Sequence, residues 1–297
     1  MNYATKDQQD RWLKPLLSGE IRSSYAMTEP QVASSDATNV EMSIVKEGNE
    51  WVLNGRKWFI TGAMNKRTRI LIVMGKSDPS NPNRHLQQTQ VLVPKDTTGL
   101  TLVRPLTTFG YDDAPIGHAE LVFENCRVPL ENVLLGEGRG FEIAQGRLGP
   151  GRMHHCMRLI GTGQRSLELA CQRTVSRTTF GRQLSKHQSV REDISRMFSE
   201  IEMARLLVLK TCHQIDDQGV SASIDMIAAT KTTVPVLMQS VIDRAIQMHG
   251  AGGLTEDYCM AEGYNYARWC RQADGPDQVH QMALGKQVIE RYSGEKA

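Results

Sequence analysis

The sequence predicts an α+β protein in which a small β-barrel or sandwich domain precedes a C-terminal antiparallel four-helix bundle. Two observations lead to this prediction. Residues from about 25 to 135 contain short apolar or alternating runs separated by turn signals, a pattern typical of small all-β domains. From Gly140 onward, apolar residues recur at a helical period instead. The chain has 297 residues, 40% of them hydrophobic, and can bury a substantial core in one or two domains.

A short helix is expected ahead of the β region, over Lys6–Leu17. Thr5 precedes it as a candidate N-cap, and Gly19 lies just past its end. The first twenty residues have no apolar signal core and are not the Arg- and Ser-rich kind found in transit peptides. The C-terminal Glu295-Lys296-Ala297 is not a peroxisomal signal. We therefore expect an intracellular protein of the cytoplasm or of an organelle matrix, mitochondrial or peroxisomal, with no targeting signal visible.

The β region has one strong turn signal. Asn54-Gly55 separates two apolar triplets, Trp51-Val52-Leu53 and Trp58-Phe59-Ile60, and so predicts a hairpin. The other expected strands are the apolar or alternating runs Arg69–Met74, Thr89–Val93, Leu100–Val103 and Glu120–Phe123.

Four long helices are expected after Gly140, and they imply an antiparallel bundle. The third starts near Ser223, and the fourth runs from about Pro276 to Tyr292. Helical stripes are carried by Leu167, Ala170, Cys171 and Thr174, by Ile194, Met197, Phe198 and Ile201, and by Val241, Ala245 and Met248.

Composition excludes several classes of function. A net charge of +2 gives no electrostatic case for binding nucleic acid, and the apolar runs are too short for a membrane span. The six cysteines lie far apart, which fits reduced thiols rather than a zinc site. The adjacent residues His154-His155-Cys156 point in different directions on a helix and cannot chelate together, so no metal is expected.

The segment Tyr25–Asn39 is the first candidate ligand site. Its hydroxyl-bearing residues Thr28, Ser34, Ser35 and Thr38 could turn toward a bound molecule. The same composition is typical of a surface loop closed by local side-chain-to-backbone turns, so both interpretations stay open.

Five later motifs also have two interpretations each. Their ordinary explanations are a strand end, loop glycines before a helix, a cation at a helix C-terminus, a glycine helix stop and a helix start. The alternative is that each contacts a ligand. The motifs are Phe59-Ile60-Thr61-Gly62, Gly138–Arg152, Arg177–Arg182, Gln247–Gly253 and Ala273–Gln278.

Taken in order, these motifs resemble the acyl-CoA dehydrogenase family. Thr28-Glu29-Pro30 followed by Ser35-Asp36 is similar to the family's flavin loop, and Arg177–Gly181 with His187-Gln188 is similar to its Arg-x-Thr-Phe-Gly…His-Gln pattern. The sequence of Val32–Asn39 resembles that of one branch of the family, whose larger animal members share the chain with a kinase-like domain. The resemblance implies three parts: a remnant of an N-terminal helical domain (1–24), a β domain that binds flavin and acyl-CoA (25–135) and a helical bundle domain (136–297).

The resemblance also implies an FAD cofactor. An aromatic ring such as Phe59, or its neighbour Trp58, would pack on the flavin ring, Thr61 would bond near flavin N5, and Arg177 would meet the diphosphate of a neighbouring subunit. The implied FAD-binding residues are Tyr25, Met27, Thr28, Ser34, Phe59, Ile60, Thr61, Arg177, Thr179, Phe180, Gln188, Gln247, Gly250, Ala251, Pro276, Asp277 and Gln278.

By the same resemblance, Asp274 occupies the position of the catalytic base, where most of the family has Glu and this branch has Asp. An alternative base position in the family aligns with Gly151, which cannot serve. Asp274, with its pKa raised by an apolar cleft, would remove the α-proton of an acyl-CoA while a hydride passes to flavin N5, giving trans-2-enoyl-CoA. The implied substrate contacts are Ser35, Arg152 and Gly275.

The implied setting is fatty acid β-oxidation, with an electron-transfer flavoprotein as acceptor and a homo-oligomer, dimer or tetramer, as the working form. Two alternatives stay open at this point: a non-catalytic flavin-binding fragment, and an acyl-CoA oxidase that passes electrons to oxygen.

Overall fold

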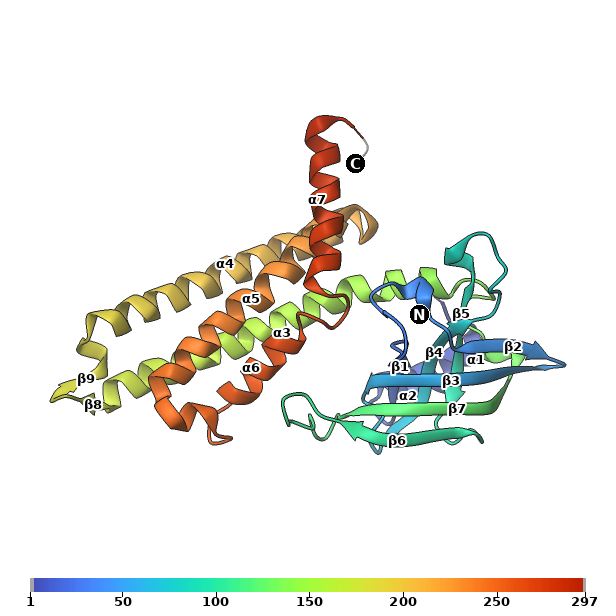
Figure 1. Cartoon of the computed structure of the whole chain (residues 1–297), viewed down its shortest axis with the longest axis horizontal. Coiled ribbons are helices and arrows are strands. Elements are labelled where there is room, and N and C mark those ends of the chain that lie inside the picture. Colours follow the sequence, from blue (N-terminus) through green and yellow to red (C-terminus); the bar gives the residue numbers. More distant parts are fainter. Residues whose placement is uncertain (1–2, 296–297) are drawn as a thin grey trace. The chain divides into compact units, whose positions relative to one another are not determined.

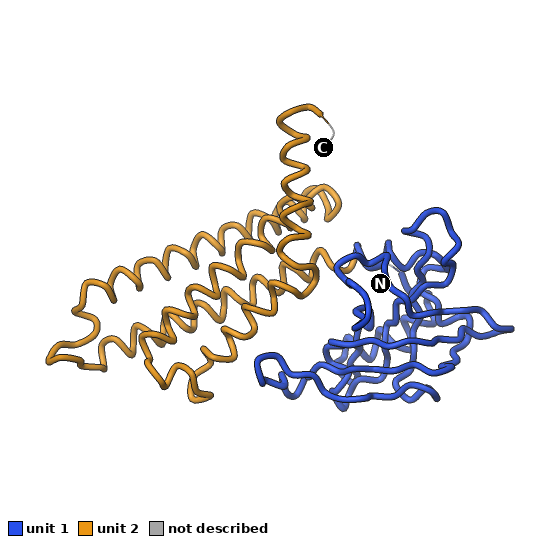
Figure 2. The backbone as a smooth tube through the Cα atoms, in the orientation of Figure 1, with its two compact units in different colours: residues 1–146 blue, residues 147–297 orange. Residues whose placement is uncertain are grey.

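The computed structural model describes residues 3–295 and divides the chain into two compact units, residues 1–146 and 147–297 (Figures 1 and 2). The first unit is built around a sheet and the second is helical. The predicted α+β class, with the β domain ahead of a helical domain, is therefore confirmed.

The predicted N-terminal helix is present in the first unit. It consists of α1 (Lys6–Gln8), a π-helical turn (Gln9–Leu13) and α2 (Lys14–Leu17). Thr5 caps it as expected, because its hydroxyl accepts from the Gln8 N–H and the Gln8 side chain accepts from the Thr5 N–H.

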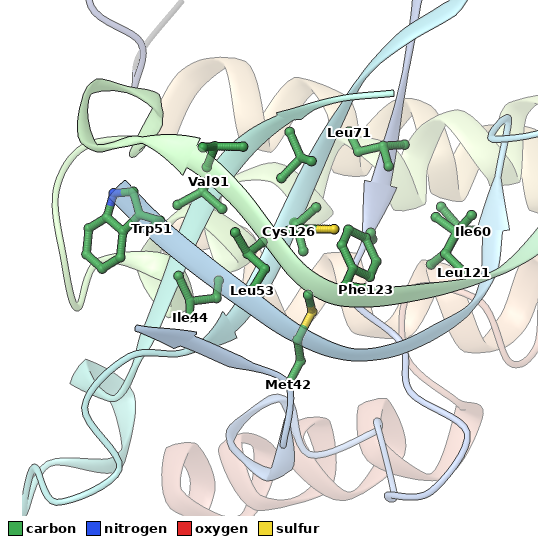
Figure 3. Packing of buried hydrophobic residues seen from close by; sticks show 14 of the residues in the cluster. Met42, Ile44, Trp51, Leu53, Ile60, Leu71, Val91, Leu121, Phe123 and Cys126 are labelled. Atoms are coloured by element: carbon green, nitrogen blue, oxygen red, sulfur yellow. The ribbon is translucent and has the colours of Figure 1, made fainter. Parts of the chain in front are cut away.

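Seven strands form one mixed sheet in the order β1-β4-β2-β3-β7-β6, with β5 paired to β4. Its core contains Trp51, Leu53, Ile60, Leu71 and Phe123, all buried (Figure 3). The strands are β1 (Arg22–Ala26), β2 (Ser43–Glu47), β3 (Glu50–Thr61), β4 (Thr68–Lys76), β5 (Gln88–Pro94), β6 (Leu100–Leu106) and β7 (His118–Pro129).

The hairpin predicted at Asn54-Gly55 is wrong. Both residues lie inside the continuous strand β3, which pairs with β2 on one side and β7 on the other. The glycine marks a bulge, with a φ of +150° and a register shift between Leu53 and Gly55. A Cβ here would lie 2.8 Å from the Met42 side chain, so the glycine serves close packing rather than a turn.

The second unit holds most of α3 (Gly140–Ser176), together with α4 (Gln188–Gln218), α5 (Ile224–His249), α6 (Met260–Trp269) and α7 (Asp277–Ser293). The sequence prediction omitted α6, and α7 begins one residue after the predicted Pro276. A small hairpin, β8 (Thr178–Thr179) with β9 (Arg182–Gln183), joins α3 to α4. Most of the predicted stripe positions are buried, but Phe198 is 60% exposed, contrary to its expected place in the core.

Across residues 3–295, no helix has the length and apolar character needed to cross a membrane. Within the same range, no group of three or more His, Cys, Asp or Glu residues is arranged to hold a metal ion. All six cysteines are free thiols.

Candidate active site

A buried ion pair anchors the loop that follows β1. Glu29 Oε1 lies 2.7 Å from Lys57 Nζ, and both side chains are fully buried. The Lys57 ammonium also donates to the Met27 carbonyl at 2.7 Å. The Glu29 carboxylate accepts the N–H groups of Glu41 and Met42 at 2.7 and 3.0 Å. The pair therefore ties this loop to β3 and to the entrance of β2.

Burial lowers the pKa of Lys57 to about 8, although the adjacent Glu29 carboxylate opposes that shift. Sequence reasoning did not single out Lys57 as a functional residue. The available signal was its place at an inward-facing position of a strand, where a lysine needs a buried partner.

The hydroxyl groups of the loop are divided between local turns and the exposed surface. Thr38, expected as a possible ligand donor, is buried and donates to Asp36 Oδ1 at 2.7 Å, so this expectation is wrong. Ser34 Oγ accepts the Glu29 N–H at 3.0 Å. Ser35 is exposed, and Thr28, whose carbonyl accepts the Trp58 N–H, is partly exposed. The local-turn interpretation thus holds for Thr38.

An aromatic edge lies at the end of β3. Phe59 is 42% exposed at a φ of +51°, and its ring meets that of Trp58 edge-on, with centroids 5.0 Å apart. The Thr61 hydroxyl lies 3.0 Å from His118 Nδ1. Ile60 differs from its neighbours, because its side chain is buried in the sheet core. The edge therefore presents an apolar ring next to a hydroxyl.

Tyr25 and His118 support this region from within the first unit. The Tyr25 hydroxyl accepts from Gln90 Nε2 at 2.8 Å. Burial lowers the pKa of His118, while Asp113, whose carboxylate lies 3.4 Å from Nε2, acts in the opposite direction. Sequence reasoning missed His118.

The predicted base lies on a constrained loop of the second unit. Asp274 and Gly275 have φ values of +56° and +104°. The Asp274 carbonyl accepts from Arg152 Nε at 2.9 Å and lies 3.2 Å from His280 Nε2. The Asp274 side chain is 20% exposed, and its Oδ2 lies 3.3 Å from His155 Nε2. Residues of α3 and α7 thus fix both the backbone and the carboxylate.

The pKa of Asp274 lies below its ordinary value. Burial by itself raises this pKa, but the hydrogen bond from His155 and the attraction of His155, Arg147 and Arg152 outweigh it. The expectation of a raised pKa is therefore wrong. An apolar cleft was expected around the carboxylate, whereas α3 presents cationic and hydrogen-bonding groups to it.

Two glycines leave room for this arrangement. A Cβ on Gly151 would lie 3.3 Å from Asp274 Oδ2, so any side chain there would crowd the carboxylate. A Cβ on Gly275 would lie 2.7 Å from His280 Nε2. The predicted substrate residue Gly275 is thus required by packing, and Arg152, predicted to contact CoA, has its Nε engaged with the Asp274 carbonyl.

Charged side chains also support the loop that contains Asp274 and Gly275. The fully buried Lys231 ammonium donates to the carbonyl of Cys270 and lies 3.4 Å from that of Gly275. Arg271 Nε donates to Asp277 Oδ2 at 2.7 Å. Asp277, predicted to contact the cofactor, is therefore a buried member of a structural ion pair. Sequence reasoning missed Lys231.

The pKa of His280 predicts how the stability of the second unit depends on pH. Burial first, and then the Arg152 charge, lowers the His280 pKa from 6.5 to about 4. Because the folded pKa is depressed, its contribution to stability is present above pH 6.5 and is lost as pH falls toward 4. Between about pH 7.5 and about pH 5, we expect this group to remove about 2 kcal/mol from the free energy of unfolding.

The measurement is urea unfolding at both pH values for the wild type and His280→Gln, which keeps a donor but does not titrate. The variant should lose that part of the pH dependence. His213→Gln, at an exposed histidine of α4, is the matched control. A pH dependence unchanged by His280→Gln would contradict the prediction.

The remaining predicted cofactor residues of the second unit lie mainly on its surface. Phe180 and Gly181 form the tip of the β8–β9 hairpin with φ values of +48° and +72°, and the Phe180 side chain is completely exposed. Gln188 donates to Glu192 within α4. Exposed residues also include Arg177, Gln247, Gly250, Ala251 and Gln278, whereas Thr179 and Pro276 are partly exposed.

Within each unit, these groups suit the parts of FAD. The first unit offers an exposed aromatic face beside a hydroxyl, which fits a flavin ring, and the second offers an exposed arginine near a glycine-containing turn, which fits a diphosphate. Their chemistry is therefore compatible with the cofactor implied by the sequence resemblance.

Family models and a solved structure both relate this chain to the family that the sequence motifs resemble. The family model described as "Acyl-CoA dehydrogenase, middle domain" matches residues 24–126, and "Acyl-CoA dehydrogenase, C-terminal domain" matches residues 138–289. A solved structure of a Mycobacterium abscessus protein assigned as an acyl-CoA dehydrogenase is 45% identical with a TM-score of 0.95. The match covers 98% of this chain and 71% of that one.

Two curated relatives are longer proteins. "Probable acyl-CoA dehydrogenase IBR3" of Arabidopsis thaliana is 52% identical over 99% of this chain, which spans 35% of that protein. "Acyl-CoA dehydrogenase family member 10" of Mus musculus is also 52% identical over 99% of this chain, which spans 27% of it. The chain therefore belongs to the acyl-CoA dehydrogenase family, and the middle and C-terminal domains of that family are the parts it carries.

Proposed function

We propose that this chain, with FAD bound, oxidises the Cα–Cβ bond of an acyl-CoA thioester to a trans-2-enoyl-CoA, with Asp274 as the base. The observation that carries the proposal is the geometry of Asp274. Its backbone has a positive φ and is held through its carbonyl by Arg152 of α3, while its partly exposed carboxylate lies 3.3 Å from His155 Nε2, beside a glycine that leaves space next to it. A strained, fixed and accessible carboxylate is the arrangement expected of a positioned base.

The residues of the chain have distinct tasks in this reaction. The Asp274 carboxylate accepts the α-proton. The Asp274 N–H donates to the thioester carbonyl and stabilises the enolate-like charge that develops there. When FAD is bound, it supplies the acceptor for the β-hydrogen as hydride. Asp is one methylene shorter than Glu, so the α-carbon must approach Asp274 more closely than it would approach a glutamate.

The lowered pKa of Asp274 has a consequence for this mechanism. It keeps the carboxylate ionised at neutral pH and so ready to accept a proton. It also makes the carboxylate a weaker base. The hydrogen bonds to the thioester carbonyl must therefore acidify the α-proton more strongly.

FAD is typical of this family. In our proposal, Phe59 and Thr61 meet the flavin ring from the β domain, and Thr28 and Ser34 shape the loop beside it. Arg177 and Phe180 would serve the cofactor of a second copy of the chain, because the Phe180 side chain is completely exposed at a hairpin tip. The exposed Phe198 on α4 is a further apolar residue that a homo-oligomer would cover.

For the substrate, we propose that Ser35 meets the pantetheine side, since it is exposed on the loop after β1. Arg152 supports the base loop through the Asp274 carbonyl. The reaction belongs to fatty acid β-oxidation, with an electron-transfer flavoprotein as the proposed acceptor.

The test is an anaerobic absorbance titration. The purified chain is loaded with FAD and titrated with a medium-chain and a long-chain acyl-CoA. We expect a bound flavin band that bleaches with at least one of them and an enoyl-CoA product detected by chromatography. A bound flavin that neither substrate bleaches, or a chain that binds no FAD, would contradict the proposal for this chain.

A further inference from the structure

The imidazole of His155 lies against the carboxylate of Asp274, with Nε2 3.3 Å from Oδ2. It lies on α3, four residues after Gly151, so the two positions share a helix face. The space beside Gly151 is therefore occupied by Asp274, and the next turn of the same face carries the imidazole.

The protonation pattern of this imidazole follows from its neighbours. Arg158 Nη2 lies 2.9 Å from His155 Nδ1, and the Tyr266 hydroxyl lies at the same distance from that nitrogen. A guanidinium can only donate hydrogen bonds, so Nδ1 must be the accepting nitrogen. The hydrogen of the neutral ring is then on Nε2, the nitrogen that lies 3.3 Å from Asp274 Oδ2.

Further contacts fix the ring itself. Its centroid lies 5.6 Å from that of Trp269 in an edge-on arrangement, and Arg158 stacks over the Tyr266 ring at 5.2 Å. Tyr266 and Trp269 are in turn packed edge-on at 4.9 Å. The imidazole is thus held by two aromatic residues of α6 and by a cation of α3.

We propose that His155 is a positioning residue for the base: through its Nε2–H it holds the Asp274 carboxylate in one rotamer, while Arg158 and Tyr266 fix its tautomer. This inference rests on the proposed function, because it assigns a role to Asp274 that only a reacting carboxylate has. The proposed function needs only Asp274 itself. The inference adds a series of side-chain contacts that runs from α6 through α3 to the loop that carries the base.

Two effects follow. The carboxylate loses freedom to rotate away from the acyl chain, which favours a reactive geometry. It is also stabilised in its ionised form, which sets the acidic limit of activity. Two other charged groups of α3, Arg147 and Arg152, act on the same carboxyl, and Lys231 of α5 interacts with it electrostatically. On α7, His280 meets the Asp274 carbonyl, and Asp277 is paired with Arg271.

The test compares four variants. His155→Phe keeps an aromatic ring but removes the donor, His155→Gln can place an amide N–H near the position of Nε2, and His155→Asn is too short to do so. His154→Phe is the matched control, because His154 is the exposed neighbour on the same helix. The first readout is the Asp274 carboxyl pKa by ¹³C NMR of aspartate-labelled protein, with its signal assigned through Asp274→Asn.

In His155→Phe and His155→Asn we expect this pKa to rise by about one unit, the acidic limb of kcat/KM to shift with it, and kcat to fall about tenfold. His155→Gln should recover a large part of both, and His154→Phe should match the wild type. Asn and Gln are polar, so they give the same comparison if the Phe variant does not fold.

An Asp274 pKa and kcat that are unchanged in both His155→Phe and His155→Asn would overturn the inference. So would equal losses in His155→Asn and His155→Gln, because a merely structural role predicts no rescue by the longer amide. Since the NMR readout needs no turnover, failure of this inference is distinguishable from failure of the proposed function, which the flavin titration of the wild type decides.

Discussion

Replacing Asp274 by Asn is expected to lower kcat about a thousandfold or more while leaving the fold and FAD binding intact. The amide has almost the shape of the carboxylate, and its oxygen can still accept from His155 Nε2, which lies 3.3 Å from Asp274 Oδ2 in the wild type. It cannot accept the α-proton, and removal of a general base typically costs factors of about 10² to 10⁴. The measurement is steady-state turnover of an acyl-CoA with an artificial electron acceptor.

The control is Asp217→Asn, an amide substitution at an exposed aspartate of α4. It should retain wild-type turnover. Circular dichroism and flavin absorbance must match between the two variants for the comparison to hold. Turnover of Asp274→Asn within a few fold of the wild type would remove this residue from the mechanism.

Breaking the Glu29–Lys57 pair is expected to have the largest effect on stability. Either Glu29→Ala or Lys57→Met leaves one charge without its partner in a fully buried site. Such changes typically cost about 3–5 kcal/mol, a large share of the stability of a domain. We expect a loss of this size in the unfolding free energy of the first unit, measured by urea titration, together with weaker FAD binding as the loop after β1 loosens.

The double variant Glu29→Leu/Lys57→Met separates this mechanism from simple loss of packing. It removes both charges at once, so it should be destabilised by clearly less than the sum of the single variants. It should still fall below the wild type, because the N–H groups of Glu41 and Met42 lose their acceptor. Strict additivity of the two single effects would show that the pair is not coupled.

The sequence was most informative where local rules decide the outcome. The capped N-terminal helix depends on Thr5, Gln8 and a following glycine, all within one short segment. The change from strand to helix at Gly140 depends on the period of apolar residues. Such features need no knowledge of distant residues, so they could be predicted.

The failures have equally specific causes. Asn54-Gly55 has turn chemistry, but the packing of Met42 against Gly55 and pairing of β3 on both sides override it. Glu29 and Lys57 are 28 residues apart in sequence, so only the folded sheet brings them together. Phe198 fits a helical stripe but lies on the edge of that stripe that faces away from the core.

The active-site loop shows both situations at once. The order of motifs leads to Asp274 as the proposed base, and this stays a prediction. The expected direction of its pKa was wrong because the cations of α3 are more than a hundred residues away in sequence. A sequence signal for His155 did exist. Gly151 and His155 are four residues apart on one helix, so the residue one turn beyond the small position could have been paired with Asp274.

Exchange of the α-hydrogens of an acyl-CoA in deuterated water tests the central claim most directly, because it reports proton removal without any later step. The FAD-loaded chain is incubated anaerobically with the substrate, and deuterium at the α-carbon is followed by mass spectrometry. We predict steady incorporation with the wild type and none above the uncatalysed rate with Asp274→Asn. Equal incorporation by both proteins would show that another group removes the α-proton.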